Sequence, residues 1–130
     1  MSKHLSVLFV DDDEYTGRLI VDFLQSENID AAHALSIAQA LKIIRKPKPD
    51  IILLDWELRD GTGADFIEHI HRWGKNWQAI PIIWITAKAM VGDKEACLNV
   101  GGVDYISKPF ELETLLQKID EHHPKEKAPN

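Results

Sequence analysis

Acidic, hydroxyl and amine side chains follow four separate apolar runs of this sequence, and together they could accept a phosphoryl group. Asp11 and Asp12 directly follow the first run, Asp55 follows the second, and Thr86 and Lys108 come after two later ones. Carboxylates held close together repel one another unless they take up protons or bind a cation, and an all-oxygen site suits Mg²⁺ or Mn²⁺. A carboxylate can attack phosphorus as a nucleophile, while lysine and threonine pair with the phosphoryl oxygens.

The apolar runs themselves predict strands that are buried on both faces, as in a parallel sheet covered by helices. They are Leu5–Val10, Ile51–Leu54, Ile82–Ile85 and Val103–Ile106, with Ile29–Ala34 as a weaker fifth candidate. Helical spacing of apolar side chains predicts helices over Tyr15–Ser26, Ser36–Arg45, Gly63–Trp73, Lys88–Val100 and Leu112–Asp120. Strand and helix alternate about five times, which indicates an α/β domain with a parallel sheet and right-handed crossovers.

The predicted helices carry signals at their ends. Ser36 with Gln39 three residues later resembles a capping box, and Asp13 suits the N-cap of the first helix. The pair Gly101-Gly102 ends the fourth helix. Because ligands bind at the C-terminal ends of the strands in an open parallel sheet, the acids, the hydroxyl and the amine should converge on one edge.

Length and composition limit the classes of function. The chain has 130 residues, 45% of them hydrophobic, which suits one domain with one core. Its formal net charge of −6 argues against direct nucleic-acid binding, which needs a basic surface. The single cysteine, Cys97, cannot form an internal disulfide, so we expect a reducing compartment. No apolar stretch approaches the roughly 20 residues that span a bilayer, so we expect a cytoplasmic protein without membrane contact.

From about Leu5 to His122 the sequence resembles the receiver domain of two-component response regulators, of the chemotaxis-regulator-like superfamily. The matching segments are VLFVDDDEYTGRLI, DIILLDWELRDGTGADFI, IPIIWITAKA and GGVDYISKPFELETLL, each after its own strand. The resemblance implies a doubly wound, flavodoxin-like (βα)5 fold, with five parallel strands in the order 2-1-3-4-5. It implies a receiver domain over residues 1–122 and a polar tail over residues 123–130.

The resemblance also implies the phosphoryl acceptor and the metal ligands. Asp55 matches the aspartate that is phosphorylated in the family. Asp11 and Asp12 match the acidic pair that holds Mg²⁺, and Asp55 and the backbone carbonyl of Glu57 complete the protein part of the metal shell.

Other matches imply how the phosphoryl group is sensed. Thr86 and Lys108 match the hydroxyl and the amine that bond it, and Ala87 leaves room for it. Tyr105 matches the aromatic residue that moves inward when Thr86 moves. Pro109 follows Lys108 through a cis bond, as in the family. Gly63 matches the glycine before the third helix.

Two residues depart from the family pattern. Arg59 stands where the family often has proline, so we expect a less rigid loop after Asp55. Glu57 brings a carboxylate close to the phosphorylation site, and its charge could change the lifetime of the phosphoryl group.

Two kinds of aromatic residue have no role in the phosphoryl site. We expect Trp73, Trp77 and Trp84 to serve packing rather than contact with a ligand. The pair His122-His123 is expected in a solvated tail.

The resemblance implies a signalling role rather than a metabolic enzyme, with catalysis limited to phosphorylation and dephosphorylation of the domain itself. A histidine kinase or a histidine phosphotransfer protein would donate the phosphoryl group, and a downstream protein or a fused output domain would read it. A homodimer through the fourth helix, fifth strand and fifth helix stays open.

Two alternatives come from other classes. The first is a receiver-like interaction module that is never phosphorylated. The second is a phosphatase of the haloacid dehalogenase type. Those enzymes need a D-x-D motif after the first strand, whereas the two acids here are adjacent and the nucleophile follows a later strand.

Overall fold

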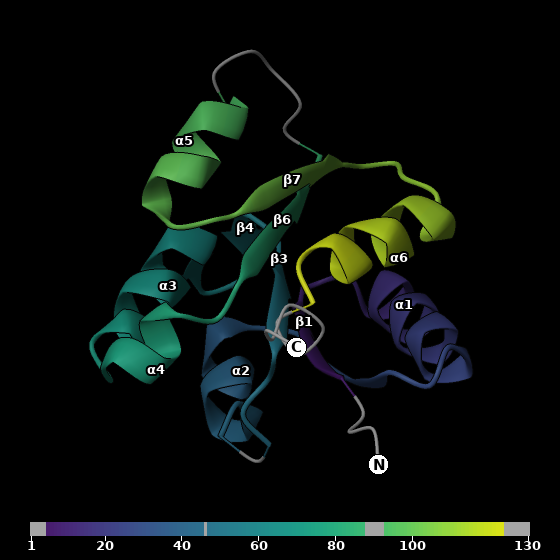
Figure 1. Cartoon of the computed structure of the whole chain (residues 1–130). Coiled ribbons are helices and arrows are strands. Elements are labelled where there is room, and N and C mark those ends of the chain that lie inside the picture. Colours follow the sequence, from purple (N-terminus) through teal and green to yellow (C-terminus); the bar gives the residue numbers. More distant parts are fainter. Residues whose placement is uncertain (1–4, 46, 88–92, 124–130) are drawn as a thin grey trace, which may run out of the picture.

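Five parallel strands form the central sheet of the protein (Figure 1). The structure is a computed structural model that describes residues 5–45, 47–87 and 93–123. The sheet strands are β1 (Ser6–Val10), β2 (Asp30–Ala34), β3 (Ile51–Leu54), β6 (Ile82–Thr86) and β7 (Asp104–Ser107). Their order is β2-β1-β3-β6-β7, which is 2-1-3-4-5 when only the strands of this sheet are counted. The predicted fold and strand order are confirmed.

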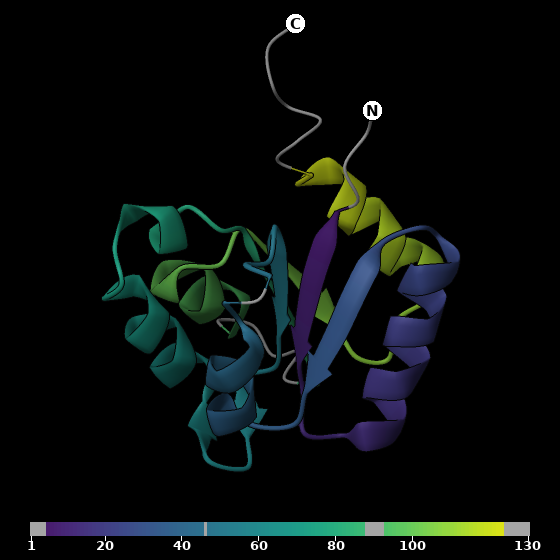
Figure 2. The same ribbon diagram turned by 90° about the horizontal axis from the view of Figure 1, so that it is seen from below.

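Helices cover both faces of the sheet, as Figures 1 and 2 show. On one face lie α1 (Glu14–Ser26) and α6 (Leu112–Glu121), which pack on the apolar cluster that contains Phe9. On the other face lie α2 (Ile37–Ile43), α3 (Gly63–His71), α4 (Lys75–Gln78) and α5 (Asp93–Val100), around the cluster that contains Trp84. Residues 88–92, where the fourth helix was also predicted, lie outside the described residues.

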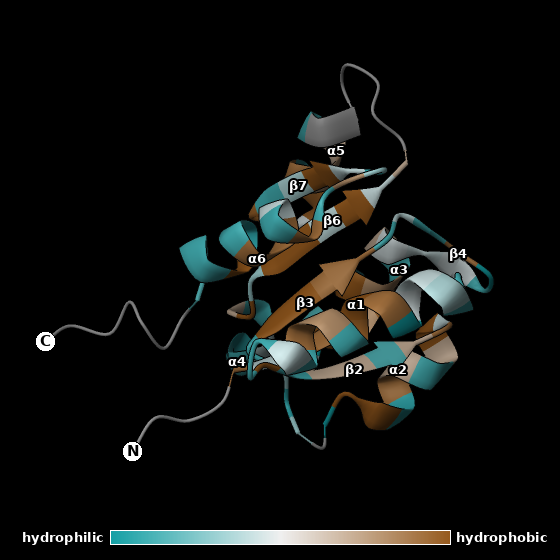
Figure 3. Ribbon diagram, turned by 90° about the vertical axis from the view of Figure 1, so that its right-hand side faces the viewer, coloured by the Kyte–Doolittle hydropathy of each residue, from teal (hydrophilic) through white to brown (hydrophobic). Residues whose placement is uncertain are grey.

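The strands are apolar throughout because successive side chains point to opposite faces and both faces are covered. In β1, Leu8 and Val10 join one cluster, whereas Val7 and Phe9 join the other. Figure 3 shows β3 as hydrophobic along its length and the edge strand β2 as mixed. The edge position of β2 explains why its sequence was the weakest of the five strand signals.

Two small elements were not predicted. Strands β4 (Glu57–Leu58) and β5 (Gly61–Thr62) pair as an antiparallel hairpin directly after Asp55, and α4 is a single short helix. Both are too short to produce an apolar period in the sequence. No helix among the described residues is long and apolar enough to cross a membrane.

The helix ends follow the predicted signals only in part. Asp13 caps α1, and α5 ends before Gly101, as predicted. The Ser36 side chain accepts from the Gln39 backbone, but the Gln39 side chain bonds to the N–H of Leu35 rather than of Ser36, so the capping box is incomplete. A complete box, formed by Thr62 and Asp65, begins α3.

His122 corrects the predicted start of a solvated tail. It is the C-cap of α6, and its Nε2 atom lies 2.9 Å from Oδ2 of Asp104 at the start of β7. Its side chain is only 22% exposed. The residue therefore belongs to the folded domain.

Candidate functional site

The carboxyl ends of the sheet strands bring the predicted site residues to one edge. Val10 and Leu54 are partners in the β1–β3 register, so Asp11 and Asp55 leave the sheet side by side. The N–H of Asp55 donates to the Val10 carbonyl over 3.0 Å, and the N–H of Lys108 donates to the Thr86 carbonyl over 2.9 Å. Site residues that are far apart in the sequence thus meet at the carboxyl edge of the sheet, as the sequence predicted.

Lys108 is the centre of the acidic site. Its Nζ atom lies 2.5 Å from Oδ2 of Asp11 and 3.1 Å from Oδ2 of Asp55. The side chain of Asp11 is fully buried, and that of Asp55 is 13% exposed. Burial lowers the pKa of Lys108, but the hydrogen bonds and charges of the two carboxylates outweigh it and raise that pKa above its usual value. Lys108 therefore stays cationic and neutralises part of the cluster.

The carboxylates are oriented by backbone N–H groups. Oδ1 of Asp11 accepts from the N–H of Asp13 over 2.8 Å, and Oδ1 of Asp55 accepts from the N–H of Trp56 over 2.7 Å. Each carboxylate consequently keeps its other oxygen, Oδ2, for Lys108 and the space beside it. The two hydrogen bonds fix the direction in which the site can bind a cation.

The donor set fits a hard divalent cation. One carboxylate oxygen from each of Asp11, Asp12 and Asp55 lies within 4.8 Å of the others. Carboxylate oxygens with room for water are the ligands that Mg²⁺ prefers. Glu57 is exposed and begins β4, two residues after Asp55. Its carbonyl remains a predicted ligand.

Thr86 and Tyr105 occupy neighbouring strands on one face of the sheet. Thr86 ends β6 and is 2% exposed. Trp84 is the register partner of Tyr105, and Thr86 is the partner of Ser107, two residues further along. Tyr105 is half-buried and packs against the cluster that contains Trp84. The role of Thr86 and Tyr105 as a switch pair remains a prediction.

Gly63 packs closely against both Trp84 and the backbone of Asp55. A Cβ atom on Gly63 would lie 2.6 Å from the carbonyl oxygen of Asp55 and 2.4 Å from the Trp84 ring. A Cβ atom on Gly102 would lie 2.3 Å from the same ring, on its other side. The Trp84 indole N–H donates to the carbonyl of Cys97 in α5 over 2.7 Å. Trp84 thus fills the space between α3 and α5, and the predicted packing role is confirmed.

The loop after Asp55 is held at its turn by side-chain hydrogen bonds, and its lower rigidity remains a prediction. Arg59 and Asp60 are the two residues between β4 and β5. Nη2 of Arg59 donates to the Asp12 carbonyl over 3.1 Å. The Asp60 carboxylate accepts from the N–H groups of Ile37 and Ala38, over 2.9 and 3.0 Å, at the start of α2. These contacts give the loop anchors that differ from those of a proline.

His33 is a second residue of the site region that the sequence did not indicate. It lies in β2, and its Nε2 atom is 2.6 Å from the backbone carbonyl of Asp11. A histidine in an edge strand and an arginine in a turn carry no pattern of their own. Only the folded chain shows that His33 and Arg59 both reach the loop that contains Asp11 and Asp12.

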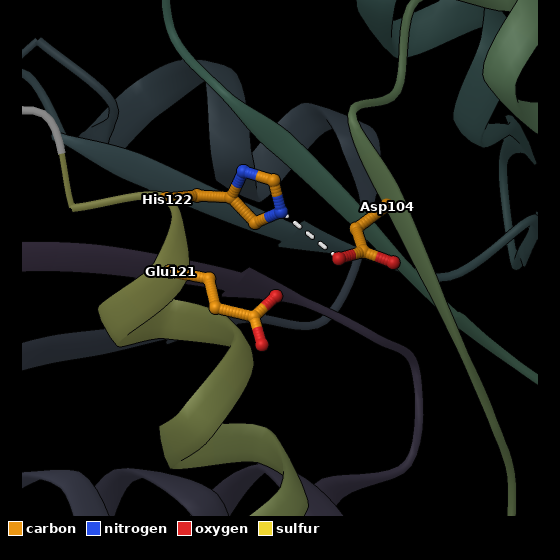
Figure 4. A group of neighbouring side chains, drawn as sticks. All are labelled: Asp104, Glu121 and His122. Atoms are coloured by element: carbon orange, nitrogen blue, oxygen red, sulfur yellow. Dashed lines mark hydrogen bonds and ion pairs between the residues drawn. The ribbon is translucent and has the colours of Figure 1, made fainter.

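A second cluster lies at the other end of β7. Figure 4 shows Asp104, Glu121 and His122 together, with ligand atoms that all lie within 4.8 Å of one another. Nζ of Lys118 already lies 3.1 Å from Oδ2 of Asp104 and 3.8 Å from Oε1 of Glu121. Burial raises the pKa of Asp104, but hydrogen bonds from His122, Tyr105 and Lys118 outweigh it and lower that pKa overall. The cluster is therefore an ion-pair network that fastens α6 to β7.

The comparison with known proteins agrees with this fold. The sequence model of the response regulator receiver domain matches residues 7–120. The KDP operon transcriptional regulatory protein KdpE of Escherichia coli is 33% identical over 128 residues, which are 96% of this chain and 55% of that protein. The phosphate regulon transcriptional regulatory protein PhoB of Escherichia coli is 32% identical over 113 residues, which are 87% of this chain and 49% of that protein. The chain spans about half the length of these curated relatives.

Solved structures lead to the same class. A two-component response regulator from Clostridium difficile superposes with a TM-score of 0.85 and 27% identity, over 96% of this chain and 100% of that one. The chain belongs to the response regulator receiver domain family. Members of this family are phosphoryl-accepting signalling switches rather than metabolic enzymes.

Proposed function

We propose that this receiver domain accepts a phosphoryl group on Asp55 and changes its partner-binding surface in response. The single observation that carries the proposal is the bridge of Lys108 between Asp11 and Asp55 at the carboxyl ends of the strands. A nucleophilic carboxylate, a second carboxylate and a cation within hydrogen-bond distance are the groups that transfer to an aspartate requires.

The transfer follows from the chemistry of these groups. A carboxylate oxygen of Asp55 attacks phosphorus, and the bond from phosphorus to the donor breaks, with its electron pair leaving on the donor atom. Lys108 stays protonated and pairs with the phosphoryl oxygens, and the Thr86 hydroxyl donates to one of them. Asp11, Asp12, Asp55 and the carbonyl of Glu57 would hold Mg²⁺, or Mn²⁺ in its place. When bound, the ion neutralises charge on the phosphoryl group.

The switch depends on the charge that arrives. A phosphoryl group brings close to −2 at neutral pH, so Lys108 and Thr86 are drawn toward Asp55. Movement of Thr86 opens space for Tyr105 on the neighbouring strand, and the surface of α5, β7 and α6 then changes shape. The phosphoryl group shifts the population between two states of the domain.

The partners follow from the family. The donor would be a histidine kinase or a histidine phosphotransfer protein, and the domain would catalyse only its own phosphorylation and dephosphorylation. A downstream protein, a fused output domain or a second copy of this chain would read the surface of α5, β7 and α6. The greater length of KdpE and PhoB supports an output segment in those relatives.

We also propose a boundary for the receiver domain. The sequence indicated a domain over residues 1–122 with a polar tail over residues 123–130. The pairing of His122 with Asp104 supports a domain that includes residue 122.

Intact mass spectrometry tests the phosphorylation. The protein is incubated with Mg²⁺ and acetyl phosphate, alongside Asp55→Asn and, as a matched control, the exposed Asp65→Asn. We expect a gain of about 80 Da, the mass of one phosphoryl group, in the wild type and the control but not in Asp55→Asn. No gain in the folded wild type would favour the interaction module that is never phosphorylated, and steady hydrolysis of a small phosphate ester would favour the phosphatase.

A further inference from the structure

Two consecutive carbonyls of the acidic loop are each held by a side chain from a different part of the fold. His33, from β2, lies 2.6 Å from the carbonyl of Asp11. Arg59, from the turn between β4 and β5, lies 3.1 Å from the carbonyl of Asp12. Asp11 and Asp12 are the first two residues after β1 and carry two of the three clustered carboxylates.

We propose that His33 and Arg59 are positioning residues that hold Asp11 and Asp12 in the orientation that binds Mg²⁺. The inference rests on the proposed function of the acidic site. Neither residue belongs to the cluster of three carboxylates. Each acts through a backbone carbonyl, because fixing a carbonyl limits the rotation of the residue that carries the carboxylate.

The position of His33 is determined by packing. Its ring stacks on Phe9, with centroids 5.5 Å apart and planes 28° apart. On the other side it presses on α1, where a Cβ atom on Gly17 would lie 2.0 Å from the ring. A carbonyl oxygen can only accept, so Nε2 carries the proton and donates to Asp11. The ring has little freedom to leave this hydrogen bond.

The position of Arg59 is determined by the hairpin. The two-residue turn holds Arg59 next to Asp60, whose carboxylate is bonded to the first N–H groups of α2. Hydrogen bonds to the backbone lower the pKa of Asp60 even though burial, the largest influence, raises it. The anchor therefore stays charged at neutral pH, and the guanidinium of Arg59 is held over the acidic loop.

The charge of Arg59 makes the proposal sharply testable. A guanidinium beside a cation site repels the cation, so its removal should strengthen Mg²⁺ binding if only charge matters. If Arg59 positions Asp12, its removal should weaken Mg²⁺ binding. The two explanations predict opposite signs.

Titration with Mg²⁺ alone, followed by tryptophan fluorescence, measures the effect. Trp56 is the reporter because it directly follows Asp55, and its backbone N–H donates to the Asp55 carboxylate. Comparison with Trp56→Phe shows how much of the fluorescence change comes from Trp56. Binding of Mn²⁺ measured by electron paramagnetic resonance is an independent readout. For His33→Phe and Arg59→Met we expect the dissociation constant to rise roughly three- to tenfold, as the loss of one hydrogen bond that supports a ligand implies.

Two further variants, His33→Gln and Gly17→Ala, distinguish a positioning role of His33 from a general effect on folding. His33→Gln keeps a donor at similar reach and should recover most of the affinity, whereas His33→Phe preserves the ring contacts without the donor. Gly17→Ala should raise the dissociation constant as His33→Phe does, because its methyl group displaces the ring. Thermal melting in EDTA verifies that each variant is folded.

The outcomes distinguish this inference from the proposed function. Unchanged affinity in folded His33→Phe and Arg59→Met, or tighter binding in Arg59→Met, would overturn the positioning role while leaving the acceptor role of Asp55 intact. A wild-type protein that binds neither Mg²⁺ nor Mn²⁺ would overturn the metal site and the inference together.

Discussion

At the scale of single residues, the acidic site depends on one cation. Asp11 is fully buried, and the ammonium of Lys108 is the cation beside it in the described structure. Removing the partner of a buried carboxylate is strongly destabilising, because it leaves an uncompensated buried charge. Lys108 therefore stabilises the metal-free domain, and in the function that we propose it also pairs with the phosphoryl group.

We expect Lys108→Met to lower the free energy of unfolding of the metal-free protein by about 3 kcal/mol, because Asp11 and Asp55 lose their counter-charge. Mg²⁺ should restore part of this loss, since it can take the place of the ammonium charge. Urea denaturation in EDTA and in Mg²⁺ measures both. Lys75→Met, on the exposed side of α4, is the control, and an equal effect of the two substitutions would contradict the role of Lys108.

His71 predicts a dependence of stability on pH. Burial lowers the pKa of His71, and its Nε2 atom is buried without a hydrogen-bond partner among the described residues. The folded state thus favours the neutral ring, and as the pH falls below about 6.5 the unfolded chain takes up the proton first. Stability from this residue is present above that pH and lost below it.

We therefore expect His71→Leu to reduce the fall in unfolding free energy between about pH 7 and pH 5. His69→Leu, on the exposed side of α3, should leave the slope unchanged. Urea denaturation at a series of pH values gives the slopes. Equal slopes in wild type and His71→Leu would show that burial does not hold the ring neutral.

At the scale of elements, the hairpin β4–β5 links three loops at the site. It begins two residues after Asp55, reaches the loop after β1 through Arg59, and reaches the start of α2 through Asp60. Ser36 also caps α2, through the N–H of Gln39, so the first turn of α2 has two capping side chains. The hairpin thus couples α2 to the acidic site.

We expect Asp60→Ala to cost about 1 kcal/mol of stability, because two N–H groups of α2 lose their acceptor. Asp60→Asn keeps one acceptor oxygen and should cost less. Urea denaturation measures both, with the exposed Asp22→Ala in α1 as the control. An Asp60→Ala variant as stable as that control would mean that water replaces the cap without cost.

The elements also show what sequence could predict. Buried strands such as β3 and β6 produce continuous apolar runs, and Asp11, Asp55 and Thr86 each directly follow such a run, so the fold and the edge of the site were predictable. The hairpin was not predictable because its strands are too short to produce an apolar period. The contacts of His33 and Arg59 were not predictable because they join residues distant in sequence. The pairing of His122 with Asp104, which also joins residues distant in sequence, could not be predicted either.

At the scale of the whole molecule, the last helix is fastened to the last strand. Asp104 at the start of β7 bonds to both Lys118 and His122 near the end of α6. The face formed by α5, β7 and α6 is the one that we propose responds to phosphorylation. The end of this face that is distant from Asp55 is therefore held by ion pairs, whereas its near end lies beside Thr86, the register partner of Ser107 in β7.

We expect a chain that ends after Glu121 to be less stable by about 1–2 kcal/mol than one that ends after His123, because the bond of His122 to the Asp104 carboxylate is lost. Thermal and urea denaturation of the two chains provide the comparison. In an Asp104→Asn background the difference should shrink. Equal stability of the two chains would place the boundary of the domain before residue 122.

The close packing of Gly63 and Gly102 against Trp84 limits how these three positions can evolve. The indole ring lies where a Cβ atom on either Gly63 or Gly102 would clash, at 2.4 and 2.3 Å. A lineage could gain tryptophan at this position only after both neighbours had become glycine, and neither glycine could then mutate alone. We expect relatives that carry tryptophan at the position of Trp84 to carry glycine at both other positions, so the three sites should evolve as one unit.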